Sequence, residues 1–231
     1  INNIFLEGLT VCTKKMRSIK VDSLTGIVEA DAGVMLPTMS NMLAKNGLQG
    51  GEWTVGIPGT IGGAIYMNAS SGELSLADNL LSVKVIDKKT LEIFEIPKKD
   101  INFQYRFSSF QQNNLLIISA KLLFEPRGNV DQLLKTTKKN LHKKTNTQPY
   151  DLPSFGSVFK NPTNNYAGKL IEEAGLKGFK IGGAEISTMH GNFIVNKSHA
   201  NSQDILNLIT VIQQKVLQKR GIFLQTEVRM I

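Results

Sequence analysis

The sequence predicts an α+β protein built in two parts. Runs of β-branched residues separated by turns dominate its first half, and its second half is more helical. With 41% hydrophobic and 20% charged residues, the composition is that of an ordinary globular protein, and no apolar run approaches the roughly 18 residues that span a bilayer. Because the pattern changes near Gly128, we expect domains at residues 1–127 and 128–231.

The first half carries two hairpin patterns, each made of two apolar runs around a turn. They are Ser18–Val21 with Gly26–Ala30, and Ser82–Ile86 with Leu91–Ile96. Leu36–Asn46 has apolar residues at helical spacing and is followed by Gly47, which predicts a helix with a glycine after its last turn. Leu115–Phe124 predicts a long strand.

The second half predicts three helices and two strands. Val130–Lys144 is a basic amphipathic helix, and Tyr166–Ala174 is a helix that ends before a glycine. Asn201 is predicted to cap a third helix, with Asp204 at its third position. The apolar face of that helix carries Ile205, Leu208, Ile209, Ile212 and Val216. Asn192–Asn196 and Phe223–Ile231 read as strands.

The net charge is +8, from 27 Lys and Arg against 19 Asp and Glu. This excess suits either a nucleic acid or a small polyanionic ligand, and the scattered lysines without interleaved aromatic residues favour the small ligand. A single cysteine, Cys12, excludes an internal disulfide and indicates a reducing cytoplasm. The three histidines lack metal-ligand spacing, so we expect no metal site.

The glycine-rich stretch Gly56–Asn68, GIPGTIGGAIYMN, organises the chain. Glycine lets a bulky ligand approach the backbone closely, and converging N–H groups would make a seat for phosphate oxygens. The spacing matches neither the Rossmann nor the Walker A motif. The stretch therefore suggests a diphosphate-bearing ligand, and a tight turn between buried elements is the alternative interpretation.

Three further places combine polar groups with loop positions. Arg106, in Tyr-Arg-Phe-Ser, could hold a carboxylate or phosphate, or could be a surface arginine. Ser157, near Lys160 and Asn161, could transfer a proton or cap a turn. Glu227 on the last predicted strand is a candidate acid or a solvent-facing residue.

Taken in order, these stretches resemble the bacterial UDP-N-acetylenolpyruvoylglucosamine reductase family, flavoenzymes of peptidoglycan precursor synthesis. The resemblance is to the shorter subtype and covers nearly the whole chain. The matching stretches are GIPGTIGGAIYMNA at 56–69, YRFS at 105–108, GSVFKNP at 156–162, AGKLIEEAGLKG at 167–178, IGGAEISTMHGNFIVN at 181–196 and LQTEVRMI at 224–231.

The resemblance implies an FAD-binding domain of the vanillyl-alcohol-oxidase type followed by a substrate-binding domain. It also implies reduction by NADPH of the enolpyruvyl group on UDP-N-acetylglucosamine, giving UDP-N-acetylmuramate. The expected partners are these small molecules, with neither nucleic acid nor membrane, for a monomer in the cytoplasm. Other possible functions are another FAD-linked oxidoreductase of the same superfamily and a non-enzymatic basic module that binds polyanions or nucleotides.

The resemblance also assigns roles to particular residues. The family's catalytic serine falls on Ser157, which would protonate C2 of the substrate, and its arginine and glutamate fall on Arg106 and Glu227, which would polarise the substrate carboxylate. Lys160 and Asn161 match positions beside the substrate's diphosphate and uracil. The cofactor would contact Gly56, Ile57, Pro58, Gly59, Thr60, Gly62, Gly63 and Asn68.

Two departures from the family pattern stand out. The family's Gly-Gly-Gly-Ser-Asn pyrophosphate loop would lie just before Ile1, so we expect a chain that lacks its natural N-terminus and binds FAD weakly by itself. Ala69–Gly72 stands where the family commonly has Gly-Ala-Tyr-Gly, a change that we expect to be tolerated.

Overall fold

The computed structural model describes residues 9–229 and divides into two compact units, residues 10–143 and 144–229. Each unit has its own hydrophobic core and is described by itself. The α+β expectation is confirmed, because both units combine helices with antiparallel strands. The predicted domain boundary at residue 128 stays a prediction.

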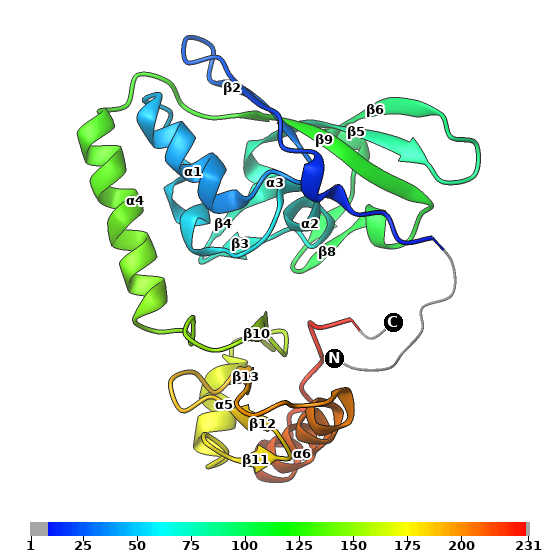
Figure 1. The fold of residues 1–231 in the computed structure, drawn as a ribbon, viewed down its shortest axis with the longest axis vertical. Coiled ribbons are helices and arrows are strands. Elements are labelled where there is room, and N and C mark those ends of the chain that lie inside the picture. Colours follow the sequence, from blue (N-terminus) through cyan, green and yellow to red (C-terminus); the bar gives the residue numbers. More distant parts are fainter. Residues whose placement is uncertain (1–8, 230–231) are drawn as a thin grey trace. The chain divides into compact units, whose positions relative to one another are not determined.

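The first unit is built on a five-stranded antiparallel sheet in the order β1-β2-β9-β5-β6 (Figure 1). Its strands are β1 (Ile19–Val21), β2 (Ile27–Asp31), β5 (Leu80–Asp87), β6 (Ile93–Pro97) and β9 (Leu115–Leu123). Val28 pairs with Leu122 and Val83 with Ala120, and all four side chains are buried. Alternation along the strands directs these residues to a single core.

Three helices cover the buried face of this sheet (Figure 1). They are α1 (Leu36–Lys45), α2 (Ile61–Tyr66) and α3 (Leu76–Asn79), and α4 (Val130–Thr145) follows the last strand. Met39 and Leu43 of α1 and Ile61 and Ile65 of α2 belong to the same core cluster as the sheet residues. The apolar residues at helical spacing in Leu36–Asn46 thus contribute to the core.

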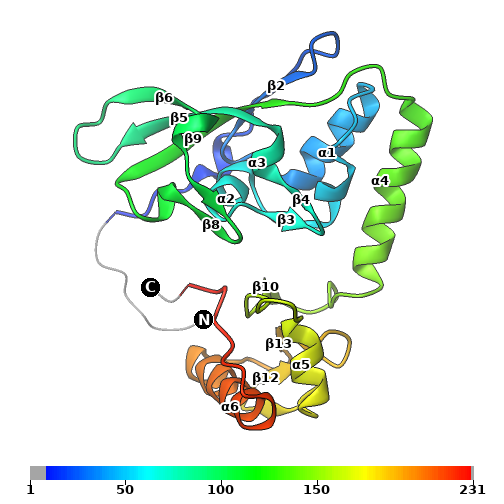
Figure 2. The same ribbon diagram turned by 180° about the vertical axis from the view of Figure 1, so that it is seen from behind.

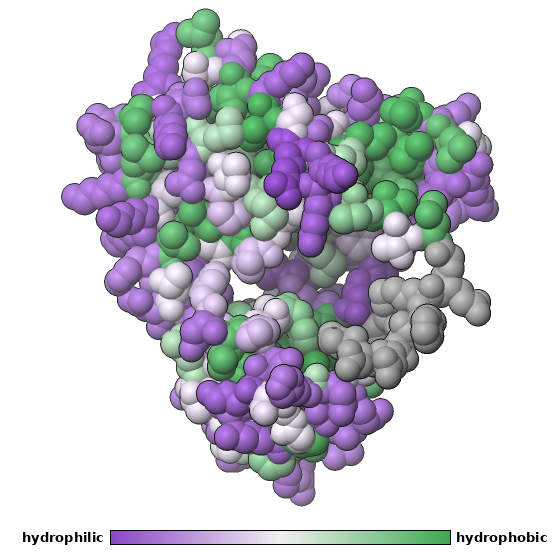
Figure 3. All heavy atoms as spheres, viewed as in Figure 1, coloured by the Kyte–Doolittle hydropathy of each residue, from purple (hydrophilic) through white to green (hydrophobic). Residues whose placement is uncertain are grey.

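Hydrophobic side chains also gather at the end of the β5–β6 hairpin, as Figure 3 shows. Leu91, Ile93, Phe94 and Leu116 are exposed there, the first to 69%.

The second unit pairs a four-stranded antiparallel sheet, in the order β10-β13-β12-β11, with two helices (Figure 2). The strands are β10 (Ser154–Ser157), β11 (Lys180–Ile181), β12 (Ala184–Ile186) and β13 (Phe193–Asn196), and the helices are α5 (Ala167–Glu173) and α6 (Ser202–Arg220). Asn201 caps α6 and accepts a hydrogen bond from the Asp204 amide at 2.9 Å, as predicted. Among the described residues, no helix has the length and apolarity to cross a membrane.

The predicted hairpins, internal strands and helices are confirmed, and their predicted ends differ from the observed ones by at most two residues. The predicted terminal strand Phe223–Ile231 is wrong for its described part, residues 223–229. That segment makes a single bridge, Thr226 to Phe159, because the partner it meets is the loop that follows β10. A strand needs a longer run of such pairs, although the exposed Phe223 and the buried Leu224 alternate as strand residues do.

Candidate active site

The glycine-rich loop runs from the short helix at Glu52–Gly56 into α2. At the start of α2 the amide of Ile61 donates to Val34 O, that of Gly62 to Ala32 O, and that of Gly63 to Thr60 Oγ1. These three donors are used within the protein. The prediction that they converge on a phosphate is therefore wrong for these amides.

Gly59 nevertheless has no internal reason to be glycine. Its φ is not positive, and a Cβ added there would meet only Ile57 Cγ2, at 3.9 Å. Gly63 is similar, because its nearest neighbour would be Thr60 Oγ1 at 3.6 Å. Neither packing nor backbone conformation requires glycine at these two positions. The absence of a side chain there fits the close approach of a flat or bulky ligand such as FAD.

Gly62, in contrast, is explained by packing within the chain. A Cβ at this position would lie 3.0 Å from Ala32 Cβ and 3.2 Å from its carbonyl oxygen. Gly56 is buried, Ile57 is half-buried against the core and Pro58 is exposed. The predicted cofactor residues of this loop are therefore of two kinds, some that shape the loop and some that leave its surface open.

Asn68, the last predicted cofactor residue, turns its side chain into the protein. Its Nδ2 donates to Gln104 O at 3.0 Å, and its Oδ1 accepts from the Ala77 amide at 3.4 Å. The residue has a φ of 44°, which asparagine tolerates better than most residues. Its side chain therefore braces two neighbouring segments.

Arg106 lies at the turn of a short hairpin formed by β7 (Phe103–Gln104) and β8 (Phe107–Ser108). Its φ of 55° is left-handed, and its guanidinium lies 5.1 Å from the centre of the Tyr105 ring. Arg106 Nη1 donates to Ser70 Oγ at 2.7 Å. The arginine is therefore held at a turn whose conformation few side chains adopt readily.

Two residues that sequence reasoning missed fix this hairpin from behind. Gln111 Nε2 donates to Tyr66 O at 2.8 Å and to Arg106 O at 3.3 Å. Ser108 Oγ, fully buried, donates to the same Tyr66 carbonyl at 2.7 Å. The two bonds to Tyr66 O join residues more than 40 positions apart, and no local sequence pattern predicts them.

Ser157 ends strand β10 directly after a bulge. Ser154 pairs with Val195 and Ser157 with Phe193, so β10 has one residue more than its partner between these two pairs. Gly156 takes a φ of 82° within this bulge. Bulges re-aim the side chain that follows them, and this one sets the direction of the half-buried Ser157.

Asn192 holds the loop after Ser157 in place. It was not among the residues that the sequence predicted for the site. Its Oδ1 accepts from the Phe159 amide at 2.9 Å, and its Nδ2 donates to Phe159 O at 2.8 Å. Its own carbonyl accepts from the Val158 amide at 2.9 Å. The side chain is buried, so the clamp is shielded from water and rigid.

The segment that carries Glu227 lies against this same loop. The Glu227 amide donates to Val158 O at 2.8 Å, and the Lys160 amide donates to Gln225 O at 2.9 Å. Two of the three predicted catalytic residues, Ser157 and Glu227, are thus brought together in one unit by backbone hydrogen bonds. Arg106 belongs to the other unit.

The two predicted substrate-binding residues on this loop differ in their surroundings. Lys160 is half-buried. Asn161 Oδ1 accepts from the Ala167 amide at 3.0 Å, which satisfies one of the N-terminal amides of α5. Asn161 therefore has a structural contact besides its predicted role.

His190 packs behind the loop as a half-buried side chain. Its ring meets that of Phe193 edge to face, at 4.9 Å between centroids, and its Nδ1 accepts from the Asn192 amide at 3.2 Å. Burial lowers the pKa of His190, and the charge of Lys177 lowers it further. These contacts give His190 a structural role behind the loop.

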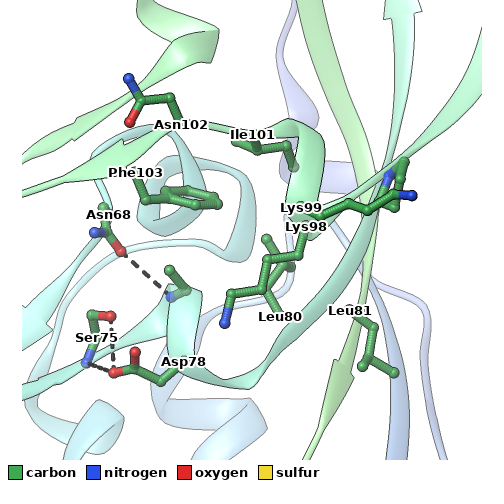
Figure 4. Close-up of a pocket in the computed structure, with 12 residues that line it drawn as sticks. Asn68, Ser75, Asp78, Leu80, Leu81, Lys98, Lys99, Ile101, Asn102 and Phe103 are labelled. Carbon is green, nitrogen blue, oxygen red and sulfur yellow. Dashed lines mark hydrogen bonds between the residues drawn. The ribbon is translucent and has the colours of Figure 1, made fainter.

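A separate open pocket of about 880 Å³ lies beside α3 in the first unit (Figure 4). Asn68 is its link to the predicted site, and Phe103, Lys98 and Leu80 also line it. The figure shows the bond from Asn68 to the Ala77 amide and the two bonds from Ser75 to Asp78 at one side of it. Neither Arg106 nor Ser157 lines this pocket.

Two protein-family models match this chain. Residues 3–94 match the model of an FAD binding domain, and residues 148–231 match the model of the UDP-N-acetylenolpyruvoylglucosamine reductase C-terminal domain. The chain is therefore a flavin-dependent oxidoreductase with an FAD-binding domain followed by a family-specific domain, which confirms the predicted fold class.

Individual relatives identify the family. The chain is 83% identical over all 231 residues to a UDP-N-acetylenolpyruvoylglucosamine reductase of Prochlorococcus marinus subsp. pastoris, and it covers 78% of that protein. A Synechococcus enzyme of the same name is 46% identical over 97% of the chain and 75% of the relative. The crystal structure of the Thermus caldophilus reductase is 31% identical with a TM-score of 0.76, covering 90% of this chain and 73% of that one. The chain belongs to the UDP-N-acetylenolpyruvoylglucosamine reductase family.

Proposed function

We propose that this protein reduces the enolpyruvyl group of UDP-N-acetylglucosamine enolpyruvate to the lactyl ether of UDP-N-acetylmuramate, as an NADPH-dependent enzyme of peptidoglycan precursor synthesis. The 83% identity to a curated reductase over the whole chain supports this function. When bound, FAD supplies hydride exchange between NADPH and the substrate. The chain's own residues supply binding, orientation and the proton.

Ser157 is the proposed proton donor. Adding hydride to C3 of the enolpyruvyl double bond leaves negative charge at C2, and Ser157 Oγ–H would deliver a proton there to complete the reduction. A serine hydroxyl is a weak acid in water, but it needs to donate only as charge builds at an adjacent carbon. The bulge at Gly156 and the Asn192 clamp hold the loop that presents this hydroxyl.

Arg106 and Glu227 are the proposed partners of the enolpyruvyl carboxylate. A guanidinium can bind a carboxylate through two parallel hydrogen bonds, and a carboxylic acid can donate to it as charge develops. Both interactions favour enolate character at C2. We further propose that Lys160 and Asn161 contact the diphosphate and uracil side of the substrate.

The observation that carries this assignment is the bond from the Glu227 amide to Val158 O, the carbonyl next to Ser157. A carboxylate near the end of the described chain gains a fixed place only if its backbone is anchored. Here the anchor is the residue that follows the proposed proton donor. The backbones of Ser157 and Glu227 thus lie on two adjacent segments that are joined by hydrogen bonds.

The cofactor contacts are also part of the proposal. The open surface at Gly59 and Gly63 supports FAD binding along the glycine-rich loop, with contributions from Gly56, Ile57, Pro58, Thr60, Gly62 and Asn68. Because the Asn68 side chain is bonded inward, we assign its contribution to its backbone and to the shape of the loop.

We propose that the protein acts as a monomer in the cytoplasm and binds no nucleic acid. A nucleotide-linked substrate and NADPH are polyanions, and they account for the charge of +8 without a nucleic acid. Light scattering of the purified protein, with and without substrate, tests the oligomeric state.

An anaerobic absorption experiment on the complete natural protein tests the reaction itself. NADPH should bleach the visible flavin absorption, and UDP-N-acetylglucosamine enolpyruvate should then restore it. UDP-N-acetylglucosamine, which lacks the enolpyruvyl group, is the control and should restore nothing. If neither compound restores the visible flavin absorption, the proposed substrate is wrong and another FAD-linked oxidoreductase is favoured.

A further inference from the structure

Ser70 contacts Arg106 although no sequence pattern assigns it a role. It lies in β3 (Ser70–Ser71), which pairs with β4 (Leu74–Ser75) in a small hairpin after Asn68. Its Oγ accepts a hydrogen bond of 2.7 Å from Arg106 Nη1. Both residues lie in the first unit and both are half-buried.

We propose that Ser70 is a positioning residue that holds the Arg106 guanidinium in the orientation that receives the substrate anion. The proposal rests on the role of Arg106 proposed above. An arginine side chain has many rotamers, and ordering it on binding would cost affinity. A hydrogen bond that already fixes one guanidinium nitrogen removes part of that cost before the substrate arrives.

The backbone around Arg106 is fixed independently of Ser70. Asn68 Nδ2 holds Gln104 O at 3.0 Å on one side of the turn, and Gln111 Nε2 holds Arg106 O at 3.3 Å on the other. These contacts set where the arginine side chain starts. The contact with Ser70 acts at the far end of this side chain. Losing the Ser70 hydroxyl should therefore remove one of the contacts that orient the guanidinium and leave the turn in place.

The chemistry of the acceptor matters, because Ser70 offers a neutral hydroxyl. A carboxylate in its place would neutralise the guanidinium and compete with an anionic ligand, whereas this contact leaves the positive charge in force. The Ser70 hydroxyl accepts from Arg106 Nη1 and so orients the guanidinium without neutralising it.

The neighbouring serine provides a matched control. Ser71 lies on the same two-residue strand and pairs with Leu74, and successive side chains on a strand point to opposite faces. Ser71→Ala therefore removes an identical hydroxyl from the same hairpin and leaves the Arg106 contact intact. Ser70→Thr keeps a hydroxyl at the contact position.

The experiment compares these variants in the complete flavin-loaded protein. Ser70→Ala should lower kcat/KM for the enolpyruvyl substrate about tenfold, mainly through KM, and should weaken binding of the product UDP-N-acetylmuramate by a similar factor in calorimetry. Flavin reduction by NADPH and the melting temperature should stay near wild type. Ser70→Thr should restore most of the loss, and Ser71→Ala should match wild type.

An equal effect of Ser70→Ala and Ser71→Ala, or a failure of Ser70→Thr to restore binding, would overturn the positioning role. The variant Arg106→Ala distinguishes a failure of the Ser70 positioning role from a failure of the proposed function. If Arg106→Ala leaves kcat/KM unchanged, the role of Arg106 is wrong; if it abolishes turnover while Ser70→Ala is neutral, only the inference about Ser70 fails. In the Arg106→Ala background, Ser70→Ala should cause no further loss of product affinity.

Discussion

Glu227 shows how a residue can have a fixed position without belonging to a sheet. Its segment makes one bridge, between Thr226 and Phe159, and packs Leu224 and Val228 against the core. The Glu227 amide is bonded to Val158 O, next to Ser157. The backbone of Glu227 is therefore anchored near the proposed proton donor, and we propose that its carboxylate acts from there on charge that develops in the transition state.

Glu227→Gln should lower kcat by about 10²-fold and change KM little, because the lost interaction belongs to the transition state. Glutamine keeps the shape of the side chain and loses its titratable proton. Steady-state kinetics on the complete protein measures the effect. Gln225→Ala, an exposed position two residues earlier, is the control and should match wild type. Wild-type kcat in Glu227→Gln would reduce Glu227 to an ordinary carboxylate.

His190 should make the stability of the protein depend on pH. Burial, with the charge of Lys177, lowers its pKa in the folded state below the usual value of about 6.5. Below about pH 6.5 the unfolded chain therefore binds more protons than the folded protein. The stability that the half-buried imidazole contributes is present above that pH and is lost as the pH falls through the folded pKa.

His190→Gln should flatten this dependence, since glutamine can still accept from the Asn192 amide but does not titrate. Urea midpoints at pH 7.5 and 5.5 measure it, and wild type should lose more stability than the variant over this interval. Equal losses in the two proteins would show that other groups cause the effect.

The β10 bulge and the glycine-rich loop are the two elements that place the proposed site. Both contain glycines, and the structure separates the reasons for them. At Gly156 the reason is backbone conformation, because φ is 82° and a Cβ would meet nothing within 4 Å. At Gly62 it is packing against Ala32, and at Gly59 neither reason applies.

Gly156→Ala should cost about 1 kcal/mol of stability through its left-handed backbone and should also slow substrate turnover, because the bulge aims Ser157. Gly175→Ala is a matched control, with a φ of 77° after α5 and equally open surroundings. Thermal melts should show similar losses for both, while turnover should fall only for Gly156→Ala. A parallel loss of turnover in both variants would argue that the bulge has no special role.

Gly59→Ala should leave the fold as stable as wild type and weaken FAD about tenfold or more, because the added methyl group occupies surface that no part of the described chain needs. Gly62→Ala should instead lower the melting temperature through its close contact with Ala32. Each variant is unfolded to remove its flavin, refolded and titrated with FAD, and the FAD affinities of Gly59→Ala and Gly62→Ala are compared. Unchanged FAD affinity in Gly59→Ala would remove this glycine from the cofactor site.

Local elements were largely predictable from the sequence, because hairpins and helices follow from apolar periodicity and turn residues within short windows. The contacts that complete the site were not. Ser70, Gln111 and Asn192 act through hydrogen bonds to residues 33 to 45 positions away, and no local pattern encodes such partners. The terminal segment was misread because its apolar residues suggest a strand, whereas its partner is a loop.

At the scale of the whole molecule, the charge of +8 agrees with three polyanionic ligands, the UDP-linked substrate, NADPH and FAD. A basic protein steers such ligands toward it, and this effect weakens with salt. Charge alone would fit a nucleic-acid partner equally well. The family membership favours the reductase reaction, and so do the hydrogen-bonded segments that carry Ser157 and Glu227.

The central claim is that Ser157 supplies the proton that completes reduction of the substrate, and stopped-flow kinetics of Ser157→Ala tests it most directly. Ser198→Ala, at an exposed serine of the same unit, is the control. Flavin reduction by NADPH should stay near the wild-type rate in Ser157→Ala, while flavin reoxidation by the enolpyruvyl substrate should slow by about 10²- to 10⁴-fold, the usual loss for one general acid. Equal slowing of both half-reactions, or a wild-type rate of reoxidation, would contradict the account.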